Sequence, residues 1–306
     1  MSGTDKNPFP NYDLREDYPD LNVPPGIFIP TTDDGAWEYF TKHRWVYNKL
    51  EVALSQGLKC GPVGAEPSSF PVFMKPIINL YGTGLGSSLI INAKEYEHKK
   101  YSSGYFWMEY LEGDHLSHDL VVVDGKVVFC LTFKGHSLGK GMFDFWETAE
   151  TPSDALEYIT HWVQNNLQSY SGSVNMETIG GKIIECHLRM GDINSLYNYQ
   201  LMQCIIDVYA GKGWDFRETI APFYLFALWG DWGVKYHLDL NAVEQLCEEL
   251  TYYQIEHPDD PQNPPGGVRL ALLCDYDKEK CIRVRNALFE NFSPKPGKPK
   301  TDKSKK

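Results

Sequence analysis

Polar and apolar residues alternate on both sides of the glycine pair at positions 180 and 181. Strict alternation predicts two strands that form a β-hairpin, each with one polar face and one apolar face. A two-residue turn would place Met176 opposite Glu185 and bury half of the polar groups. A three-residue loop over 180–182 instead places Glu177 opposite Glu185. The hydrophobic pattern therefore favours the three-residue loop.

In this register the polar side chains of both strands gather on one face of the hairpin. Asn175 lies opposite His187, and the full set is Asn175, Glu177, Glu185, His187 and Arg189. Placing carboxylates, an amide, an imidazole and a guanidinium together is costly unless they bind a cation or an anionic ligand. The alternative is a solvated face of an antiparallel sheet, and the hairpin alone does not distinguish the two.

An upstream segment carries further binding chemistry. The pattern predicts a short buried strand that ends in Lys75, and a lysine in such a strand needs an anion nearby. A loop with three spaced glycines and two serines follows, and such a loop presents backbone N–H groups to phosphate oxygens. It lacks the Gly-Lys-Ser/Thr ending of a P-loop, and an ordinary hairpin turn is the alternative. Further on, Asp124-Gly125 between β-branched runs predicts another hairpin.

Taken in order, these segments resemble the ATP-grasp superfamily over the region from Trp45 to Asp192. A Lys-Pro strand, a flexible glycine-rich loop, a Glu-x-x-x-Gly hinge and a strand similar to Glu-x-Asn-x-Arg occur in the family in the same order. This order is far more specific than any single motif. The resemblance implies an α+β fold in which two subdomains with antiparallel sheets grip ATP.

The resemblance also implies a set of nucleotide-binding residues. Lys49 corresponds to the first ATP-contacting lysine of the family, and Lys75 to the second, which reaches the α- and β-phosphates. Backbone groups after the hinge glutamate bind the adenine edge, and a glutamate further on binds the ribose. The corresponding residues here are Glu109, Tyr110 and Leu111 for the hinge, His115 or Asp114 for the ribose, and Gly82, Gly84, Gly86, Ser87 and Ser88 for the loop that closes over the phosphates.

A metal site follows from the same resemblance. Glu185 corresponds to the principal metal-binding glutamate, Asn175 stands where the family usually has an aspartate, and His187 stands where it commonly has an asparagine. Glu177 on the same strand face would compensate for the lost charge. Mg²⁺ is the expected metal, because ATP phosphates would supply most of its ligands. The imidazole makes Mn²⁺ an alternative.

Arg189 and Lys75 are the expected catalytic residues. The guanidinium of Arg189 suits the oxygens of a carboxyl-phosphate or γ-phosphate, and an ion pair with Glu177 or Asp192 is the alternative. A polar loop with Lys134, His136 and Lys140 is either a substrate contact or a flexible surface loop.

Composition restricts the class of protein. A chain of 306 residues that is 42% hydrophobic and 14% aromatic has enough apolar material for a full core. Seven cysteines without metal-ligand spacing, no signal peptide and no long apolar run indicate a reducing cytoplasm and no membrane contact. The formal net charge of −12, with a lysine-rich tail, leaves an acidic body that argues against a nucleic-acid partner.

The expected organisation has five parts. They are an extended N-terminal segment over 1–30, a first ATP-grasp subdomain with preceding helices over 31–112, a second subdomain over 113–192, a C-terminal extension over 193–292 and a disordered Lys/Pro-rich tail over 293–306. In the extension, helices are expected over 197–210, 240–255 and 278–291, and strands over 223–229 and 268–274.

The leading functional hypothesis is an ATP-dependent ligase. It would activate a carboxylate as an acyl phosphate and join it to an amine or thiol, releasing ADP and phosphate. The partners would be ATP and small-molecule carboxylate and amine substrates, and the aromatic C-terminal part is compatible with a homodimer. The alternatives are an ATP-grasp kinase that phosphorylates a small molecule and a catalytically degenerate nucleotide-binding or scaffold protein.

Overall fold

The computed structural model describes residues 21–82, 84–99, 101–191, 199–237, 240–255 and 263–294. Most of the expected N-terminal segment and of the expected tail lies outside these residues. Within the described part of the chain, no helix is both long and apolar enough to cross a membrane.

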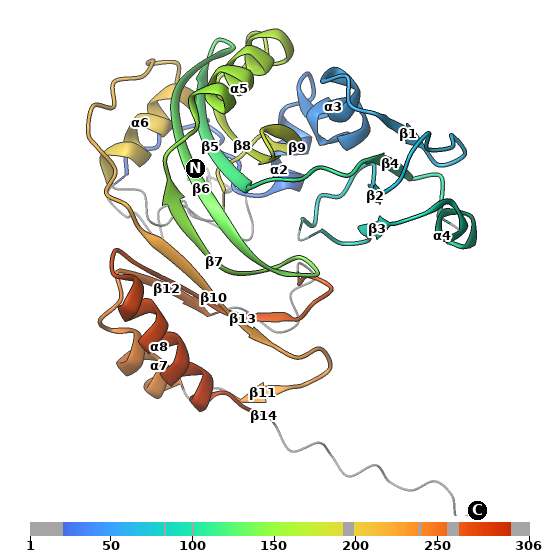
Figure 1. Cartoon of the computed structure of the whole chain (residues 1–306). Helices are drawn as coiled ribbons and strands as arrows, with labels where there is room; N and C mark the ends of the chain where they lie inside the picture. The colour runs from blue at the N-terminus through green and yellow to red at the C-terminus, as the bar shows by residue number, and fades with distance from the viewer. Residues whose placement is uncertain are drawn as a thin grey trace, which may run out of the picture.

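A small antiparallel sheet forms one side of the molecule (Figure 1). Its strands, in spatial order, are β1 (Cys60–Pro62), β4 (Tyr105–Glu109), β2 (Val72–Pro76) and β3 (Ser88–Ile90). The short helices of residues 33–98 are α2 (Asp33–Tyr39), η1 (Arg44–Tyr47), α3 (Lys49–Ser55) and α4 (Ala93–His98), of which α3 contacts β1 and α4 contacts β3. Asn48 caps α3 by accepting a hydrogen bond from the backbone N–H of Glu51, so the helix begins at Lys49.

A large antiparallel sheet of eight strands forms the rest of the core. Its spatial order is β12 (Tyr252–Ile255), β13 (Val268–Asp275), β10 (Tyr224–Gly230), β7 (Met142–Ala149), β6 (Lys126–Gly139), β5 (His115–Val123), β8 (Gly172–Ile179) and β9 (Lys182–His187). A separate two-stranded ladder pairs β11 (Tyr236–His237) with β14 (Ser293–Pro294). The expected α+β class with antiparallel sheets is confirmed.

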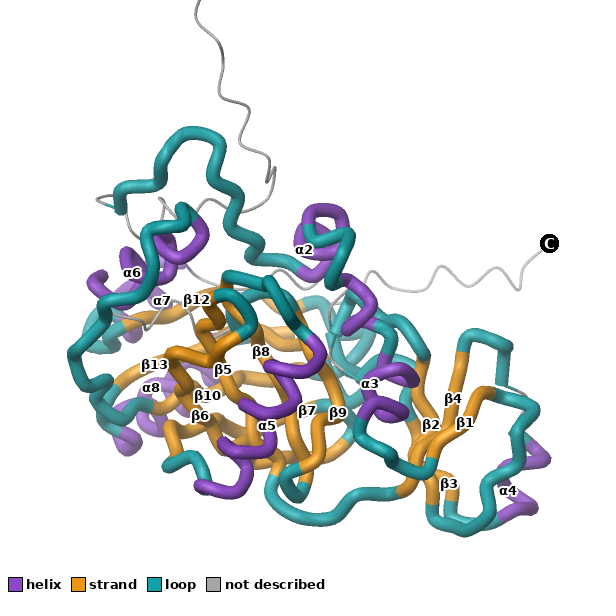
Figure 2. Tube along the Cα trace, turned by 90° about the horizontal axis from the view of Figure 1, so that it is seen from above, coloured by secondary structure: helices purple, strands orange, loops and turns teal. Residues whose placement is uncertain are grey.

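Helices cover the apolar surfaces of the large sheet. The apolar side of the β8–β9 hairpin packs against α5 (Ser153–Asn166) and the helices of residues 33–55 in one cluster. The helices α7 (Leu240–Cys247) and α8 (Lys278–Asn291) pack together with β10 and β13, as Figure 1 shows. On the other face, α6 (Tyr199–Tyr209) covers part of β6, β10 and β13. Figure 2 shows α5 lying across β5 and β8 on one side of the sheet.

The β8–β9 hairpin has the predicted strand pairing but not the predicted loop. Glu177 lies opposite Glu185 and Asn175 opposite His187, so the register is confirmed. The turn, however, contains only Gly180 and Gly181, which both have positive φ, as a tight hairpin turn requires. The extra residue is Ile184, which forms a β-bulge between the turn and the paired glutamates. The predicted three-residue loop was therefore wrong. The bulge shifts the pairing by one residue, as that loop would have done, and so keeps Glu177 opposite Glu185.

One helix that was expected in the C-terminal extension is helical only in its first half. The helix expected over 240–255 ends at Cys247, and residues 252–255 form β12 at the edge of the large sheet. Tyr252 and Tyr253 pair with Cys274 and Leu273 of β13, and aromatic residues favour such half-buried edge positions. The large sheet also runs without interruption from the second subdomain into the extension, through the pairing of β7 with β10.

The Gly180-Gly181 turn packs against the segment that links the two sheets, and this contact gives a testable prediction. A Cβ on Gly180 would overlap the carbonyl oxygen of Glu112, whereas a Cβ on Gly181 would meet no atom within 4 Å. Both positions have positive φ, so both substitutions carry the backbone strain of about 1 kcal/mol. Gly180→Ala is expected to lower the free energy of unfolding by about 2–3 kcal/mol in a denaturant titration, because overpacking adds to the strain. Gly181→Ala is the matched control, and an equal loss in both variants would contradict the contact.

Candidate nucleotide and metal site

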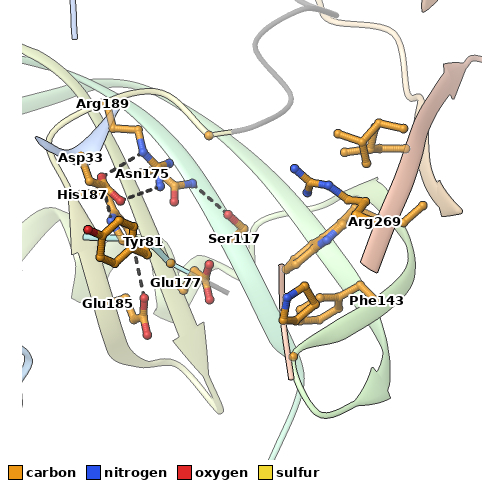
Figure 3. A pocket seen from close by; sticks show the side chains of 18 of the residues that line it. Asp33, Tyr81, Ser117, Phe143, Asn175, Glu177, Glu185, His187, Arg189 and Arg269 are labelled. Atoms are coloured by element: carbon orange, nitrogen blue, oxygen red, sulfur yellow. Dashed lines mark hydrogen bonds and ion pairs between the residues drawn. The ribbon is translucent and has the colours of Figure 1, made fainter. Parts of the chain in front are cut away.

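A pocket of about 210 Å³ lies on the polar face of the β8–β9 hairpin (Figure 3). We call it the central pocket. All five polar residues of the predicted set line it, namely Asn175, Glu177, Glu185, His187 and Arg189. Residues 80–82 of the loop after β2 form part of its boundary, and residues of β7, β10 and β13 form the far wall.

Two buried lysines converge on β9 from the small-sheet side. The Nζ of Lys49, at the start of α3, lies 2.6 Å from Oε1 of Glu185. The Nζ of Lys75, on β2, donates to the carbonyl oxygen of Ile184 at 2.8 Å. Ile184 is the bulged residue of β9, which is the last strand in the order of the large sheet. The carbonyl oxygen of Ile184 therefore holds Lys75 next to Glu185.

Burial controls the charge of these groups. The pKa of Lys75 falls to about 8, because burial disfavours the ammonium more than the charges of Glu185 and Glu177 favour it. Burial by itself raises the pKa of Glu185, but the charge of Lys49 and the hydrogen bond from His187 hold it well below its usual range. Glu185 is therefore a carboxylate at neutral pH, while Lys75 is a cation that gains from any further negative charge.

Asp33 organises the end of β9 and was missed as a site residue. Its Oδ1 lies 3.1 Å from Nδ1 of His187 and 3.0 Å from Nε of Arg189, and its Oδ2 accepts from Nη2 of Arg189 at 3.1 Å. Tyr47 donates to the same carboxylate at 3.3 Å. Burial alone raises the pKa of Asp33, but the charges of Arg189 and His187 hold it far below its usual range. In the sequence, Asp33 reads only as an acidic residue at the start of a helix.

His187 lies between two carboxylates. Its Nδ1 faces Asp33, and its Nε2 lies 3.4 Å from Oε2 of Glu185. Burial by itself lowers the pKa of His187, but the charge of Asp33 and the hydrogen bonds to Asp33 and Glu185 raise it to about 9. In this arrangement His187 is an imidazolium that joins the two acids, and both of its ring nitrogens are used.

Two further polar groups complete the near side of the central pocket. The amide nitrogen of Asn175 donates to Oγ of Ser117 at 2.9 Å and to Oδ1 of Asp119 at 2.8 Å, so its amide oxygen is the atom suited to coordinate a cation. Oε2 of Glu177 lies 2.8 Å from Nε2 of His115. Burial lowers the pKa of His115, but the hydrogen bond and charge of Glu177 outweigh it and raise the pKa.

The segment from β4 to β5 connects the two sheets where the family resemblance places its hinge. Glu109 closes β4, and its Oε1 accepts from the backbone N–H of Lys59 at 2.8 Å. Tyr110 is 44% exposed, and Leu111 packs in a cluster with Phe106 and Met108. The adenine-binding role of this segment stays a prediction.

The glycine-rich loop contributes unevenly to the central pocket. Gly82, Gly84 and Gly86 all have positive φ, and Gly82 lines the central pocket. Ser88 begins β3, and its hydroxyl lies 2.6 Å from the hydroxyl of Tyr101. Neither Ser87 nor Ser88 is among the lining residues of the part of the chain that the structure describes. Their predicted phosphate contacts would therefore require a shift of the loop.

The residues near the polar loop of β6 have partners of their own. Nζ of Lys134 lies 2.9 Å from Asp114, and Nε2 of His136 lies 2.7 Å from Glu147. These groups are not among the described residues that line the central pocket.

The donor set fits a hard cation held partly by a nucleotide. Among the described residues, no group of three or more histidine, cysteine, aspartate or glutamate side chains is placed to hold a metal by itself. Glu177, Glu185 and the amide oxygen of Asn175 supply oxygen ligands on one face, which suits Mg²⁺ completed by phosphate oxygens. His187, with both nitrogens used, does not offer a ligand in this arrangement.

Comparisons with known proteins agree with this architecture. No protein-family model matches the sequence, and no curated protein matches it. Solved structures do: an L-amino acid ligase from Bacillus licheniformis is 15% identical with a TM-score of 0.60, covering 86% of this chain and 77% of that chain. A phosphoribosylamine–glycine ligase from Thermotoga maritima is 16% identical with a TM-score of 0.61, covering 93% of this chain and 87% of that chain.

A third similar structure is the N5-carboxyaminoimidazole ribonucleotide synthetase from Thermus thermophilus. It is 12% identical with a TM-score of 0.57 and covers 88% of this chain and 82% of that chain. These proteins are built on the ATP-grasp architecture, and so is this chain. The resemblance inferred from the order of the motifs is confirmed at the level of the fold.

Proposed function

We propose that the protein is an ATP-dependent ligase, which activates a carboxylate as an acyl phosphate and joins it to an amine or thiol, releasing ADP and phosphate. The observation that carries this proposal is the convergence of Lys49 and Lys75 on the Ile184–Glu185 segment at the edge of the central pocket. Two buried cations beside a carboxylate, in an ATP-grasp fold, match what a polyphosphate and its cation need. The named ligases among the similar structures support the same class of reaction.

The proposed roles follow from the contacts. Lys75 would pair with the α- and β-phosphates, which would add to the counter-charge of Glu185 and Glu177 and offset the cost of burial. Lys49 would exchange its contact with Glu185 for a phosphate oxygen, which releases the carboxylate toward a cation. Bound Mg²⁺, held by Glu177, Glu185 and Asn175, would neutralise phosphate charge. His115 and the backbone of Tyr110 and Leu111 would hold the nucleoside, and the loop of Gly82, Gly84 and Gly86 would cover the phosphates.

The reaction needs alignment and charge neutralisation rather than a nucleophilic side chain. An oxygen of the substrate carboxylate would attack the γ-phosphorus, and the bond to the β–γ bridging oxygen would break to release ADP. The acceptor nitrogen or sulfur would then attack the acyl carbon, lose its proton and expel phosphate. The buried cations oppose the charge that develops on the transferring phosphoryl group.

A second candidate is a nucleotide-binding protein without chemistry. The observation that favours it is the arrangement at Asp33, which holds both His187 and Arg189 and so occupies two groups that the reaction would otherwise use. This candidate requires ATP binding but no transfer.

Calorimetric titration with ATP, with and without Mg²⁺, tests the nucleotide site. The wild type is expected to bind ATP in a Mg²⁺-dependent manner, and Glu185→Gln is expected to weaken binding at least about tenfold, because one charged metal ligand is lost. Glu249→Gln is the matched control, since Glu249 forms a surface ion pair with Arg283 at 2.9 Å. No ATP binding by the wild type would contradict the proposal.

Product analysis then separates the candidates. Formation of an amide or thioester with release of ADP supports the ligase. A phosphorylated product and ADP, with no amide or thioester, support a kinase. ATP binding without ADP release supports the second candidate.

A further inference from the structure

The far wall of the central pocket is an apolar strip on the C-terminal strands. Leu225, Ala227 and Trp229 alternate along β10 and line the central pocket, while the residues between them pack under α7 and α8. On β13, Leu272 lies opposite Ala227 and Arg269 opposite Trp229. Paired residues of an antiparallel ladder share one face, so these five side chains form one continuous surface.

This surface is held in place by aromatic packing. The indole nitrogen of Trp229 donates to the carbonyl oxygen of Phe143 at 2.8 Å, which fixes the ring at the tip of the β6–β7 hairpin. Phe143 packs on Trp146 with ring centroids 4.4 Å apart, and both rings contact His115. The aromatic wall therefore continues directly into the polar side, where His115 meets Glu177. Ala227 has the smallest side chain of the strip and lines the central pocket between Leu225 and Trp229.

Arg189 and Arg269 line the central pocket from opposite walls. All three guanidinium nitrogens of Arg189 donate to protein oxygens, two bonds going to Asp33 and one to the carbonyl of Met190. Arg269 rises from the opposite wall, and its guanidinium extends into the pocket toward the side where Asn175 and Ser117 lie (Figure 3). Its backbone N–H donates to Oδ1 of Asn263 at 2.7 Å, which fixes the strand at this point.

We propose that Arg269 binds the carboxylate of the acid substrate, and that the strip of Leu225, Ala227, Trp229 and Leu272 holds the rest of that molecule. A guanidinium fork matches a carboxylate, and the apolar strip beside it favours a substituent that is itself apolar or aromatic. The substrate class is thus a small monocarboxylic acid with an apolar or aromatic side group. This inference rests on the proposed ligase function.

The test uses hydroxylamine as the acceptor, because its nitrogen attacks an acyl phosphate, expels phosphate and leaves a hydroxamate, which forms a coloured complex with added Fe³⁺. The full-length protein with ATP and Mg²⁺ is expected to form hydroxamate from phenylacetate and 4-methylpentanoate at least about tenfold more efficiently than from acetate or succinate, because apolar burial contributes to binding. Calorimetric titration with phenylacetate gives a second readout that does not depend on turnover.

Two variants address the residues. Arg269→Gln is expected to raise the KM for phenylacetate about 30-fold, because one charged hydrogen-bonding contact is lost. The dissociation constant for ATP should change less than about twofold. Arg269→Lys should recover only part of this loss, because a lysine lacks the fork. Ala227→Leu should remove the preference for phenylacetate over acetate. Arg283→Gln, at an exposed arginine of α8, is the matched control.

The outcomes separate the two levels of the proposal. Hydroxamate formation without preference for the apolar acids, or equal kinetics in Arg269→Gln and Arg283→Gln, overturns the assignment of the acid subsite alone. No hydroxamate from any acid overturns the ligase function as well.

Discussion

Replacing Asp33 with alanine is expected to lower the free energy of unfolding by about 3–5 kcal/mol, because removing one partner of a buried ion pair leaves an uncompensated charge. Asp33 is 6% exposed and His187 is 3% exposed, so water cannot replace the lost carboxylate. The substitution would leave the His187 imidazolium and the Arg189 guanidinium side by side. Denaturant unfolding of the purified variant measures the loss.

Asp34→Ala is the matched control for this prediction. Asp34 has the same charge and lies in the same first turn of α2, but its side chain is exposed. It is expected to cost no more than about 1 kcal/mol, the size of a charge interaction with the helix dipole. Similar losses in Asp33→Ala and Asp34→Ala would show that helix capping, and not the buried ion network, explains the effect.

The same network predicts a pH dependence with a definite sign. The pKa of His187 is about 9 in the folded protein, above its ordinary value of 6.5, so its stabilisation is complete below pH 6.5 and is lost as pH rises toward 9. Between pH 6.5 and 8 the wild type should lose about 1–2 kcal/mol of unfolding free energy from this group. Asp33→Asn, which removes the charge that raises the pKa, should show a flatter profile over this interval.

The sequence identified the polar face of the hairpin because alternation counts residues along a strand. It could not locate the inserted residue, since a three-residue loop and a two-residue turn with a bulge place Glu177 opposite Glu185 equally well. No pattern in the sequence predicts the hydrogen bond from Lys75 to the carbonyl oxygen of Ile184, because it joins strands of two different sheets.

Asp33 was missed because an aspartate at this position is explained equally well by a local role at the start of a helix and by a long-range ion pair. An acidic residue after Thr32 is what a helix start requires, and Thr32 itself accepts the capping hydrogen bond from the N–H of Gly35. One signal was present in the sequence: the first turn of α2 has two acidic residues, Asp33 and Asp34, although one is enough for the helix start. Which of the two is buried depends on packing against β9, more than 150 residues away.

The far wall of the central pocket could not be predicted from the sequence either. Trp229 and Arg269 lie in segments whose strand character was predicted, yet their pairing joins residues that are distant along the chain. Pairing between strands that are distant along the chain leaves no periodic pattern in the sequence, because the register depends on three-dimensional packing. The same reason explains why β12 was taken as the end of a helix.

ATP binding is expected to take up protons near pH 8, and Lys75 is the group that would bind them. A lysine with a pKa of about 8 is half charged at that pH, and adjacent phosphate oxygens would raise the pKa and complete its protonation. The expected uptake is about half a proton per ATP bound. Calorimetric titration at pH 8 in two buffers of different ionisation enthalpy measures it.

Lys75→Met is expected to abolish the proton uptake and to weaken ATP binding about 100-fold, because methionine keeps much of the side-chain shape but leaves the phosphates without the buried cation. Lys212→Met, at an exposed lysine paired with Asp207 at 2.9 Å, should change neither quantity. Weaker binding with unchanged proton uptake would mean that another group near the central pocket binds the proton. Unchanged affinity would remove Lys75 from the phosphate site, and the position of β2 beside Ile184 would then serve the packing of the two sheets rather than nucleotide binding.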